Sequence, residues 1–261
     1  MEWGYTLSGL IVGFIVGVTG VGGGSLMTPL LILMFGISPA TAVGTDLLYA
    51  ALTKTGGAWV HGRRGSVSWR LVKLLAMGSL PAALITVLIL NAVGVEDKFF
   101  TSLITSMLGV ALILTALSLL LRKRLSQMAS SRFGFLIEWR DRYVESITIA
   151  TGVVLGVLVT ITSVGAGALG MVILLVLYPR APSVTLVGSD IAHAVPLTLI
   201  AGMGHAYMGT VDYSLLGSLL IGSLPGIYMG SHVGGRIPDH ILRPILSTIL
   251  IIVGAKLLMP S

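Results

Sequence analysis

Long apolar segments separated by short polar connections occupy nearly the whole chain. A helix that crosses a bilayer needs about 20 mainly apolar residues, because the hydrocarbon core is about 30 Å thick and a helix rises about 1.5 Å per residue. Most of the segments therefore predict one spanning helix each, and we expect an all-α polytopic membrane protein. The segments lie at about 5–35, 40–60, 67–93, 99–121, 144–178, 183–206, 211–234 and 241–259.

Two of these segments, 5–35 and 144–178, are too long for a single spanning helix. Each is interrupted near its middle by a cluster of small residues, at 20–25 and at 163–168. We expect each segment to form two half-helices, about 20 and 16 Å long in the first segment, that meet near the bilayer midplane. A backbone break at that depth is tolerated only inside protein or beside a polar cavity, because lipid offers no hydrogen bonds.

The two broken segments belong to an internal repeat. Residues 21–24 match 164–167 at an offset of 143, and three further blocks match at an offset of 144. Those blocks pair 43–46 with 187–190, His61 and Gly65 with His205 and Gly209, and 78–81 with 222–225. Shared apolarity explains matched Leu and Val, whereas an Asp, a His and a Pro in register indicate a duplication. We expect a first repeat at 1–121 and a second at 144–261, joined by a basic linker at 122–143.

The charged residues predict how the repeats are oriented. Cytoplasmic connections carry an excess of Lys and Arg, and the linker holds six of the 16 Lys and Arg of the chain. If each broken segment turns back as a hairpin, the other strongly basic positions fall on the side of the linker: Arg63, Arg64, Arg180, Arg236 and Arg243. Each repeat is then a broken-helix hairpin plus three transmembrane helices, and the odd number of crossings inverts the second repeat relative to the first. We expect a multi-pass protein of the cytoplasmic (inner) membrane with the linker in the cytoplasm.

Composition narrows the chemistry. Only 10% of the residues are charged and 55% are hydrophobic, against about 25% charged in soluble domains, so the lipid bilayer is an expected partner. Most of the net charge of +6 comes from the linker, which indicates topology and not nucleic-acid binding. The chain has no Cys, which excludes disulfides and thiolate metal sites. We expect no metal site and no cofactor.

The small-residue clusters have the properties of an anion site. The first N–H groups of a half-helix lack intrahelical partners and carry partial positive charge, and glycine lets a ligand approach the backbone closely. We therefore expect a small anion to bind where the half-helices restart, beside neighbouring hydroxyl groups. The candidate residues are Thr19, Gly22, Gly23, Gly24, Ser25, Thr162, Ser163, Gly165 and Gly167.

Close helix packing is the alternative role for glycine in this chain. It is favoured where glycines recur every four residues, because such a row forms one smooth helix face. The residues concerned are Gly9, Gly13, Gly17, Gly152 and Gly156.

Asp46 and Asp190 lie at matched positions well inside apolar segments. A carboxylate there costs at least about 2.5 kcal/mol on insertion scales, so its presence in both repeats needs a cause. One interpretation is coupling: the carboxylates bind a proton or a sodium ion, with His193 one helical turn after Asp190. The other is structural, with each carboxylate accepting hydrogen bonds from the backbone near a broken helix. The sequence leaves both open.

Lys54 also lies in an apolar segment. One interpretation is that it neutralises an anion or pairs with Asp46. Because its counterpart in the second repeat is the uncharged Thr198, we expect its side chain to extend instead toward the cytoplasmic end of its helix near His61. His61 and His205 close their helices beside glycines, and we expect both at the membrane interface.

The stretch Gly-Val-Gly-Gly-Gly-Ser-Leu-Met-Thr-Pro-Leu at 20–30, followed by Ala-Val-Gly-Thr at 42–45, resembles the first signature of the TauE/SafE family of sulfite exporters. The second half-signature at 163–190 is similar but less glycine-rich, with Ala166 and Ala168 in the break. The resemblance covers essentially the whole chain. It implies a transporter of the bacterial or archaeal cytoplasmic membrane for small sulfur-containing anions such as sulfite, thiosulfate or sulfonates. It marks as functional Gly22, Gly23, Gly24, Pro29, Gly44 and Thr45, and the repeat adds Ser189 as the counterpart of Thr45.

Three classes of function compete for this sequence. A secondary transporter is favoured, because inverted repeats with discontinuous helices are the build of many such proteins and no phosphate-binding loop is present to power a pump. An anion channel is the nearest rival, and an intramembrane aspartyl protease built on Asp46 and Asp190 is a third. The expected partners are a small anionic substrate, a coupling proton or sodium ion and the bilayer, while the oligomeric state is left open.

Overall fold

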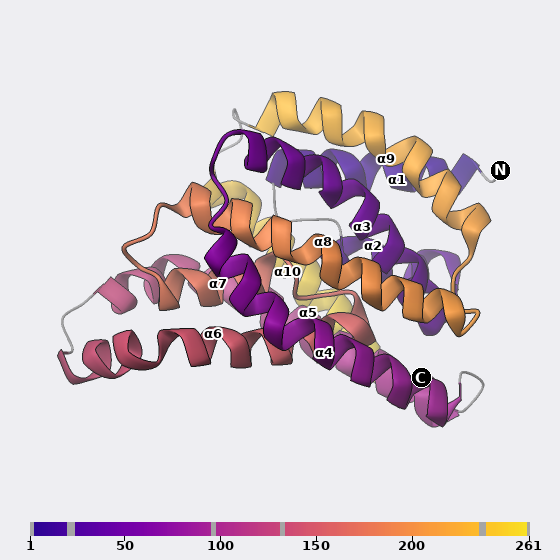
Figure 1. The fold of residues 1–261 in the computed structure, drawn as a ribbon. Helices are drawn as coiled ribbons and strands as arrows, with labels where there is room; N and C mark the ends of the chain where they lie inside the picture. The colour runs from indigo at the N-terminus through magenta and orange to yellow at the C-terminus, as the bar shows by residue number, and fades with distance from the viewer. Residues whose placement is uncertain (1–2, 20–23, 95–97, 131–133, 235–238, 260–261) are drawn as a thin grey trace.

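The computed structural model describes residues 3–19, 24–94, 98–130, 134–234 and 239–259, and over these ranges the chain is all-helical. The helices follow the expected apolar segments, with both interruptions at the expected places. Their bounds are α1 Trp3–Thr19, α2 Gly24–Phe35, α3 Pro39–Arg63, α4 Trp69–Val93, α5 Lys98–Ser130, α6 Gly134–Thr162, α7 Ala168–Leu177, α8 Ser183–Tyr207, α9 Tyr213–Gly234 and α10 Asp239–Leu258 (Figure 1).

Within the described residues, five helices contain a stretch long and apolar enough to cross a membrane: α4, α5, α6, α8 and α9. Three shorter apolar helices, α1, α2 and α7, flank the two interruptions. The 25-residue α3 is less apolar, and it carries Asp46 and Lys54. Val43 and Leu47 of α3 are fully buried in a core with Leu197 of α8. Neighbouring helices therefore cover this face of α3, whereas Leu52 and Trp59 are exposed.

The predicted linker at 122–143 differs from expectation, because most of it is helical. Helix α5 continues to Ser130 and α6 begins at Gly134. Arg, Lys, Leu, Gln, Met and Ala are good helix formers and fill 122–129 apart from one Ser, so nothing in the sequence ends α5 where the apolar segment ends. At 1.5 Å per residue the 33 residues of α5 reach about 50 Å, which is longer than a bilayer core, so the basic end of the helix extends beyond it.

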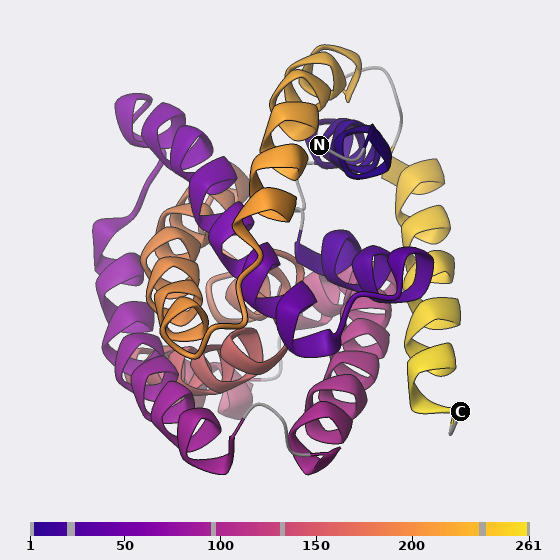
Figure 2. The same ribbon diagram turned by 90° about the vertical axis from the view of Figure 1, so that its right-hand side faces the viewer.

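Helices from the two repeats pack against each other in matched pairs. Helix α1 lies along α9, and α6, its counterpart in the second repeat, lies along α4 (Figure 2). Glycines bring these backbones into contact: a Cβ placed on Gly13 would lie 2.5 Å from Ser223 O, and one placed on Gly156 would lie 2.5 Å from Ser79 O. Gly9 and Gly152 make the corresponding contacts one turn earlier. The packing role expected for these four glycines is confirmed.

Two further pairs join equivalent helices to each other, α3 with α8 and α5 with α10. In the second pair the backbones meet at a glycine from each helix, where a Cβ on Gly254 would lie 2.8 Å from Gly109 O. The most extensive helix contacts in the described structure thus have counterparts after exchange of the two repeats, so the repeats are intertwined and do not form separate domains.

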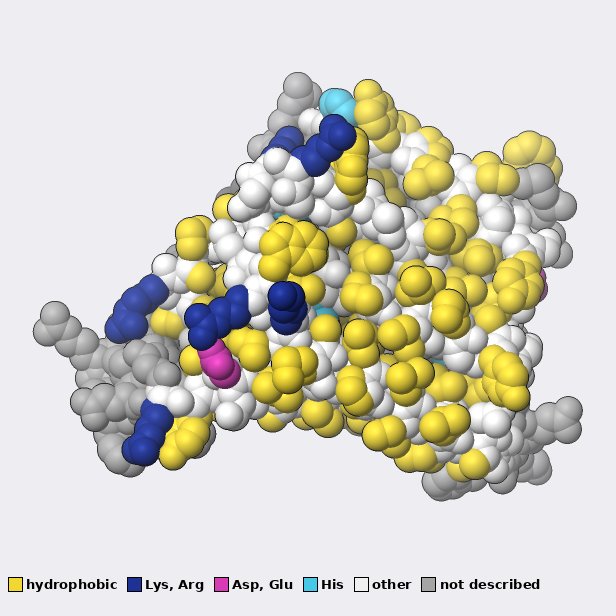
Figure 3. Space-filling view, in the orientation of Figure 1, with side chains coloured by type: hydrophobic (Ala, Val, Ile, Leu, Met, Phe, Trp, Pro, Cys, Tyr) yellow, Lys and Arg dark blue, Asp and Glu magenta, His cyan; other side chains and the backbone are white. Residues whose placement is uncertain are grey.

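The ends of the molecule differ in charge. Both chain termini lie on the right of Figure 1, whereas the last turn of α5 and the first turn of α6 lie on the left. Figure 3 shows Lys and Arg side chains gathered over the left part of the same face, with hydrophobic side chains spread over the middle and right. We therefore expect the membrane normal to run from left to right in these views, with the basic end on one side of the bilayer.

Candidate functional site

The second break, between α6 and α7, is described in full. The backbone φ is +59° at Ser163, +121° at Gly165 and +132° at Gly167. Such values suit glycine and strain other residues, so Gly165 and Gly167 have a conformational reason to be glycine besides the approach of a ligand. Thr162 Oγ1 accepts a hydrogen bond from Val164 N at 3.1 Å, so this predicted binding residue satisfies part of the break itself. Ser163 is buried, and its hydroxyl lies close enough to the Asp46 carboxylate to interact with it, although it forms no hydrogen bond of normal geometry.

The first break cannot be compared atom by atom, because the predicted residues Gly22 and Gly23 lie outside the described residues. The structure places Thr19 as the last residue of α1, and Gly24 and Ser25 as the first two residues of α2.

Asp46 of α3 points at the half-helix that follows the first break. Its side chain is fully buried, and Thr28 of α2 donates a hydrogen bond from Oγ1 to Asp46 Oδ2 at 2.5 Å. The second carboxylate oxygen, Oδ1, has no partner. A buried oxygen with lone pairs to spare is expensive unless something else binds it.

Asp190 of α8 makes the equivalent contact in the second repeat. It is 2% exposed, and its Oδ1 lies so close to Gly170 that a Cβ there would overlap it. Gly170 is in the first turn of α7, so the carboxylate lies against the partially positive end of that half-helix. Its Oδ1 also has no hydrogen-bond partner.

The prediction that the Lys54 side chain extends toward the membrane interface is wrong. Its residue is only 9% exposed, and its Nζ donates a hydrogen bond to Ala166 O, in the second break, at 2.7 Å. It interacts electrostatically with Asp190 and Asp46. The side chain therefore does not extend to the interface, because an unpaired carbonyl of the break and two carboxylates offer its ammonium group better partners inside the protein.

Asp46, Asp190 and Lys54 form a group that we call the buried centre. His193, predicted as a coupling residue, lies close enough to interact with Lys54 in this centre. Its Nε2 lies 2.7 Å from Ser79 Oγ of α4, and its Nδ1 has no partner. Its counterpart in the first repeat is Tyr49, whose buried hydroxyl lies beside Ser223, the counterpart of Ser79. The centre thus contains several polar atoms that the protein leaves unsatisfied, all close to one of the two breaks or to the carboxylates.

Thr45 and Ser189 differ from the unpartnered polar atoms just described, because their hydroxyls form hydrogen bonds with the backbone of the other repeat. Asp212 N donates to Thr45 Oγ1 at 3.1 Å, and Ser68 N donates to Ser189 Oγ at 2.8 Å. Asp212 and Ser68 immediately precede α9 and α4, whose first N–H groups need such acceptors. The structure gives both hydroxyls a capping role.

Gly44, another predicted site residue, lies at the same junction. A Cβ at Gly44 would lie 2.7 Å from Thr210 O, which is a packing reason for glycine. His205 contacts Gly44 and is fully buried, with Nε2 donating to Thr160 O at 2.9 Å. His205 is thus enclosed by protein, and its ring fills the space that the small residue leaves.

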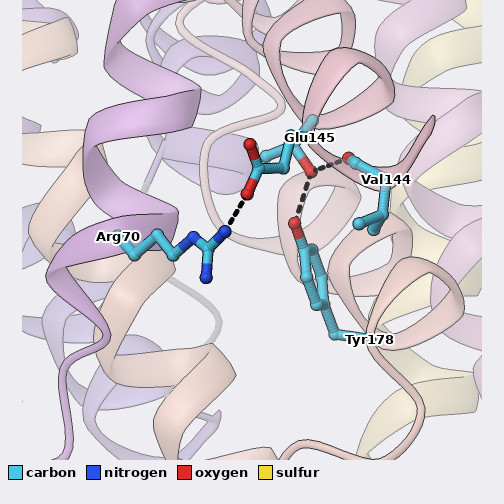
Figure 4. A network of polar contacts seen from close by, with 5 residues as sticks. Arg70, Val144, Glu145 and Tyr178 are labelled. Atoms are coloured by element: carbon cyan, nitrogen blue, oxygen red, sulfur yellow. Dashed lines mark hydrogen bonds and ion pairs between the residues drawn. The ribbon is translucent and has the colours of Figure 1, made fainter. Parts of the chain in front are cut away.

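A separate hollow of about 280 Å³ lies near the surface between α4 and α6, with Leu74, Tyr178 and Thr185 in its wall. Arg70 and Glu145 form an ion pair across it (Figure 4). Both side chains are largely exposed, so the pair contributes little stability. This hollow is distinct from the buried centre.

Sequence reasoning missed Thr28, Ser79 and the role of Lys54. Thr28 belongs to the Ser-Leu-Met-Thr-Pro motif, which was a signal for it. Ser79 lies in one of the matched blocks of the repeat, which was a signal for this residue. The partner of Lys54 carries no signal in the sequence, because it is a backbone carbonyl 112 residues away.

A multi-pass helical bundle with two interrupted apolar helices around a buried charged centre is the arrangement found in many membrane transporters. The comparisons agree: the family described as Sulfite exporter TauE/SafE matches residues 5–257. The chain belongs to the TauE/SafE sulfite exporter family. This family contains transporters and not enzymes, so the aspartyl-protease alternative is wrong.

Individual relatives cover almost the whole chain. The "Probable membrane transporter protein YjnA" of Bacillus subtilis (strain 168) is 40% identical over 252 residues, which are 97% of this chain and 98% of the relative. A second B. subtilis relative, "Probable membrane transporter protein YdhB", is 28% identical over 255 residues, 95% of this chain and 96% of the relative. "Probable membrane transporter protein MJ0441" of Methanocaldococcus jannaschii is 28% identical over 272 residues, 96% of this chain and 94% of the relative. No solved structure matches the chain significantly.

Proposed function

We propose that this protein is a secondary transporter for small sulfur-containing anions such as sulfite, thiosulfate or sulfonates. The observation that carries the proposal is the buried centre at the second break, where Lys54, Asp46 and Asp190 are held together. Buried ionisable groups in a membrane protein are costly and mark substrate or ion pathways. The name of the matching family supports a sulfur oxyanion as the substrate class.

The substrate site in this proposal lies at the two breaks. The first N–H groups of α2 and α7 supply hydrogen bonds and partial positive charge to the anion. Ser163 Oγ is an additional donor, because it is buried at the second break and forms no hydrogen bond of normal geometry. The glycine clusters 22–24 and 165–167 keep the backbone accessible. Thr45, Ser189 and Gly44 support the site from the junction between the repeats and do not touch the anion.

Asp46 and Asp190 are the coupling residues in this proposal. Both lie against the half-helices at which the anion binds, so an ionised carboxylate would repel the substrate. A proton or a sodium ion bound at the unpartnered oxygens removes that repulsion. Anion and cation then bind together, as cotransport requires.

The two repeats are proposed to have inverted topology, each with a broken-helix hairpin and three crossings. The exchange of helix partners between the repeats supports this arrangement, as does the position of both termini opposite the basic end (Figure 1). Alternating access then consists of movement of one set of helices against the other around the breaks.

The test is transport by purified protein in proteoliposomes. We expect uptake of labelled sulfite or thiosulfate to saturate and to be accelerated by the same unlabelled anion on the opposite side. This counterflow distinguishes a carrier from the channel alternative, because a simple open pore shows none. Linear, unsaturable flux would refute the carrier, and absence of flux for every sulfur-containing anion would refute the substrate class.

A further inference from the structure

Lys54 breaks the symmetry of the buried centre. Asp46 and Asp190 occupy equivalent positions, whereas the counterpart of Lys54 is the buried, uncharged Thr198, which donates to Ala194 O of its own helix at 2.8 Å. The single ammonium group therefore serves both carboxylates, with which it interacts electrostatically, and is anchored by the Ala166 carbonyl. Nothing in the fold requires a charge at this position, because the second repeat forms the same helix without one.

The charges at the centre do not balance. The titratable groups that interact with Lys54 are Asp46 on its own helix and Asp190 and His193 on α8. Helix α2 contributes Thr28, and the break between α6 and α7 contributes the hydroxyl of Ser163 and the Ala166 carbonyl. Tyr49 of α3 interacts with Asp46 and is neutral. With His193 neutral and both carboxylates ionised, the fixed charge is one negative unit. An anion that enters this centre alone makes it more negative, which a low-dielectric environment penalises strongly.

We propose that Lys54 sets the number of cations that bind together with each anion. This inference rests on the proposed function as an anion transporter with coupling cations. With the ammonium group present, one positive charge is already supplied by the protein. Removal of that charge requires one more proton or sodium ion per anion, and removal of one carboxylate requires one fewer.

The experiment measures anion affinity as a function of cation concentration. The dissociation constant of thiosulfate, which keeps its charge near neutral pH, is determined for the purified protein by calorimetry over a range of Na⁺ at constant ionic strength, with choline as the replacement ion, and over a range of pH. The slope of log Kd against the log of the cation concentration counts the cations that bind with the anion, and the Na⁺ and H⁺ slopes are added.

Four variants test the charge count. Lys54→Gln is expected to increase the summed slope by one. When the cation concentration rises tenfold, the Kd of Lys54→Gln for thiosulfate should therefore fall by a factor ten times larger than the Kd of the wild type. Lys54→Arg keeps the charge and should keep the slope. Asp190→Asn should lower the slope by one. The double variant Lys54→Gln/Asp190→Asn has the fixed charge of the wild type and should return to its slope.

Each outcome decides the matter. Equal slopes for the wild type and Lys54→Gln, with or without a loss of thermal stability, would mean that Lys54 only holds the Ala166 carbonyl. If Lys54→Gln does not fold, the slopes of Asp190→Asn and of the double variant decide instead. The inference is overturned if the double variant does not return to the wild-type slope. If the wild type binds thiosulfate with a cation dependence that no variant alters, this inference alone fails. If the wild type binds neither thiosulfate nor sulfite in any cation, the proposed function fails as well.

Discussion

Thr45 and Ser189 each place one hydroxyl group against the backbone that precedes a helix of the other repeat. The hydroxyl of Ser189 also donates to Thr185 O of its own helix at 2.7 Å, so it is fully used within the protein. A hydroxyl in this position replaces an acceptor that water or lipid does not supply. The single residue thereby links the start of one helix to the middle of another.

Replacing Ser189 with Ala should destabilise the protein without weakening anion binding. Loss of the acceptor for Ser68 N is expected to cost about 1 kcal/mol, the usual cost of losing a helix N-cap. Thermal unfolding in detergent and calorimetric titration with thiosulfate measure the two effects separately.

The two repeats provide the control for this prediction. Ser189→Thr introduces the residue found at position 45 and keeps the hydroxyl, so its stability should stay close to that of the wild type. A large loss of anion affinity in Ser189→Ala with unchanged stability would instead place Ser189 in the binding site.

The sequence allowed part of the site to be predicted, and the reason for the rest is physical. Asp46, Asp190 and the breaks were recognisable, because charge and small-residue clusters are conspicuous inside apolar segments. The position of Lys54 was not, because its choice between the interface and the interior depends on a carbonyl that only the folded backbone presents. The capping of Ser68 by Ser189 was hidden in the same way, since a backbone N–H has no sequence signature.

At the scale of helices, backbone contact through glycine defines the pairs α1 with α9 and α6 with α4. Gly13 of α1 faces Ser223 of α9, and Gly156 of α6 faces Ser79 of α4. In lipid there is no hydrophobic drive to bring two helices together, so close van der Waals packing between small residues stabilises them instead. The apolar lengths and the glycine spacing predicted these helices well, whereas the helical extension of α5 into the basic linker was missed because apolar length marks the membrane and not the helix end.

A methyl group at the α1–α9 contact should separate the two helices. In Gly13→Ala the new Cβ would lie 2.5 Å from Ser223 O and 2.7 Å from Ser223 Cα, so the helices must shift, at a cost of about 1–3 kcal/mol. We expect a lower unfolding temperature and a lower yield of monodisperse protein.

Gly217 provides the matched control in the same pair, because it lies on α9 and a Cβ there would have no neighbour within 4 Å. Gly217→Ala should leave stability unchanged or raise it by about 0.5–1 kcal/mol, since Ala is a better helix former than Gly. Equal loss of stability in both variants would show that the α1–α9 contact at Gly13 is not what lowers stability.

At the scale of the whole molecule, the exchange of helix pairs and the separation of charge suggest one direction of insertion. Helix α5 ends and α6 begins at the basic end, and both termini lie at the other (Figures 1 and 3). From the positive-inside rule we expect the α5–α6 connection in the cytoplasm.

Reporter fusions in a bacterial host test this orientation. Alkaline phosphatase fused after α10 should be active, because the C-terminal side is expected outside, and a fluorescent protein inserted between α5 and α6 should be fluorescent in the cytoplasm. Active phosphatase at the α5–α6 connection, or inactive phosphatase after α10, would contradict the inverted-repeat proposal.

The intertwined packing also has a consequence for biosynthesis. Helix α1 packs on α9, which begins at Tyr213, so the two partners leave the ribosome far apart in time. At about 5–20 residues per second, the interval is about 10–40 s. During that interval the glycine face of α1 is in the membrane without its partner. Neither half can complete its packing before the other is inserted, so an insertase or a chaperone that shields α1 should raise the yield of this protein more than that of a transporter whose halves pack separately.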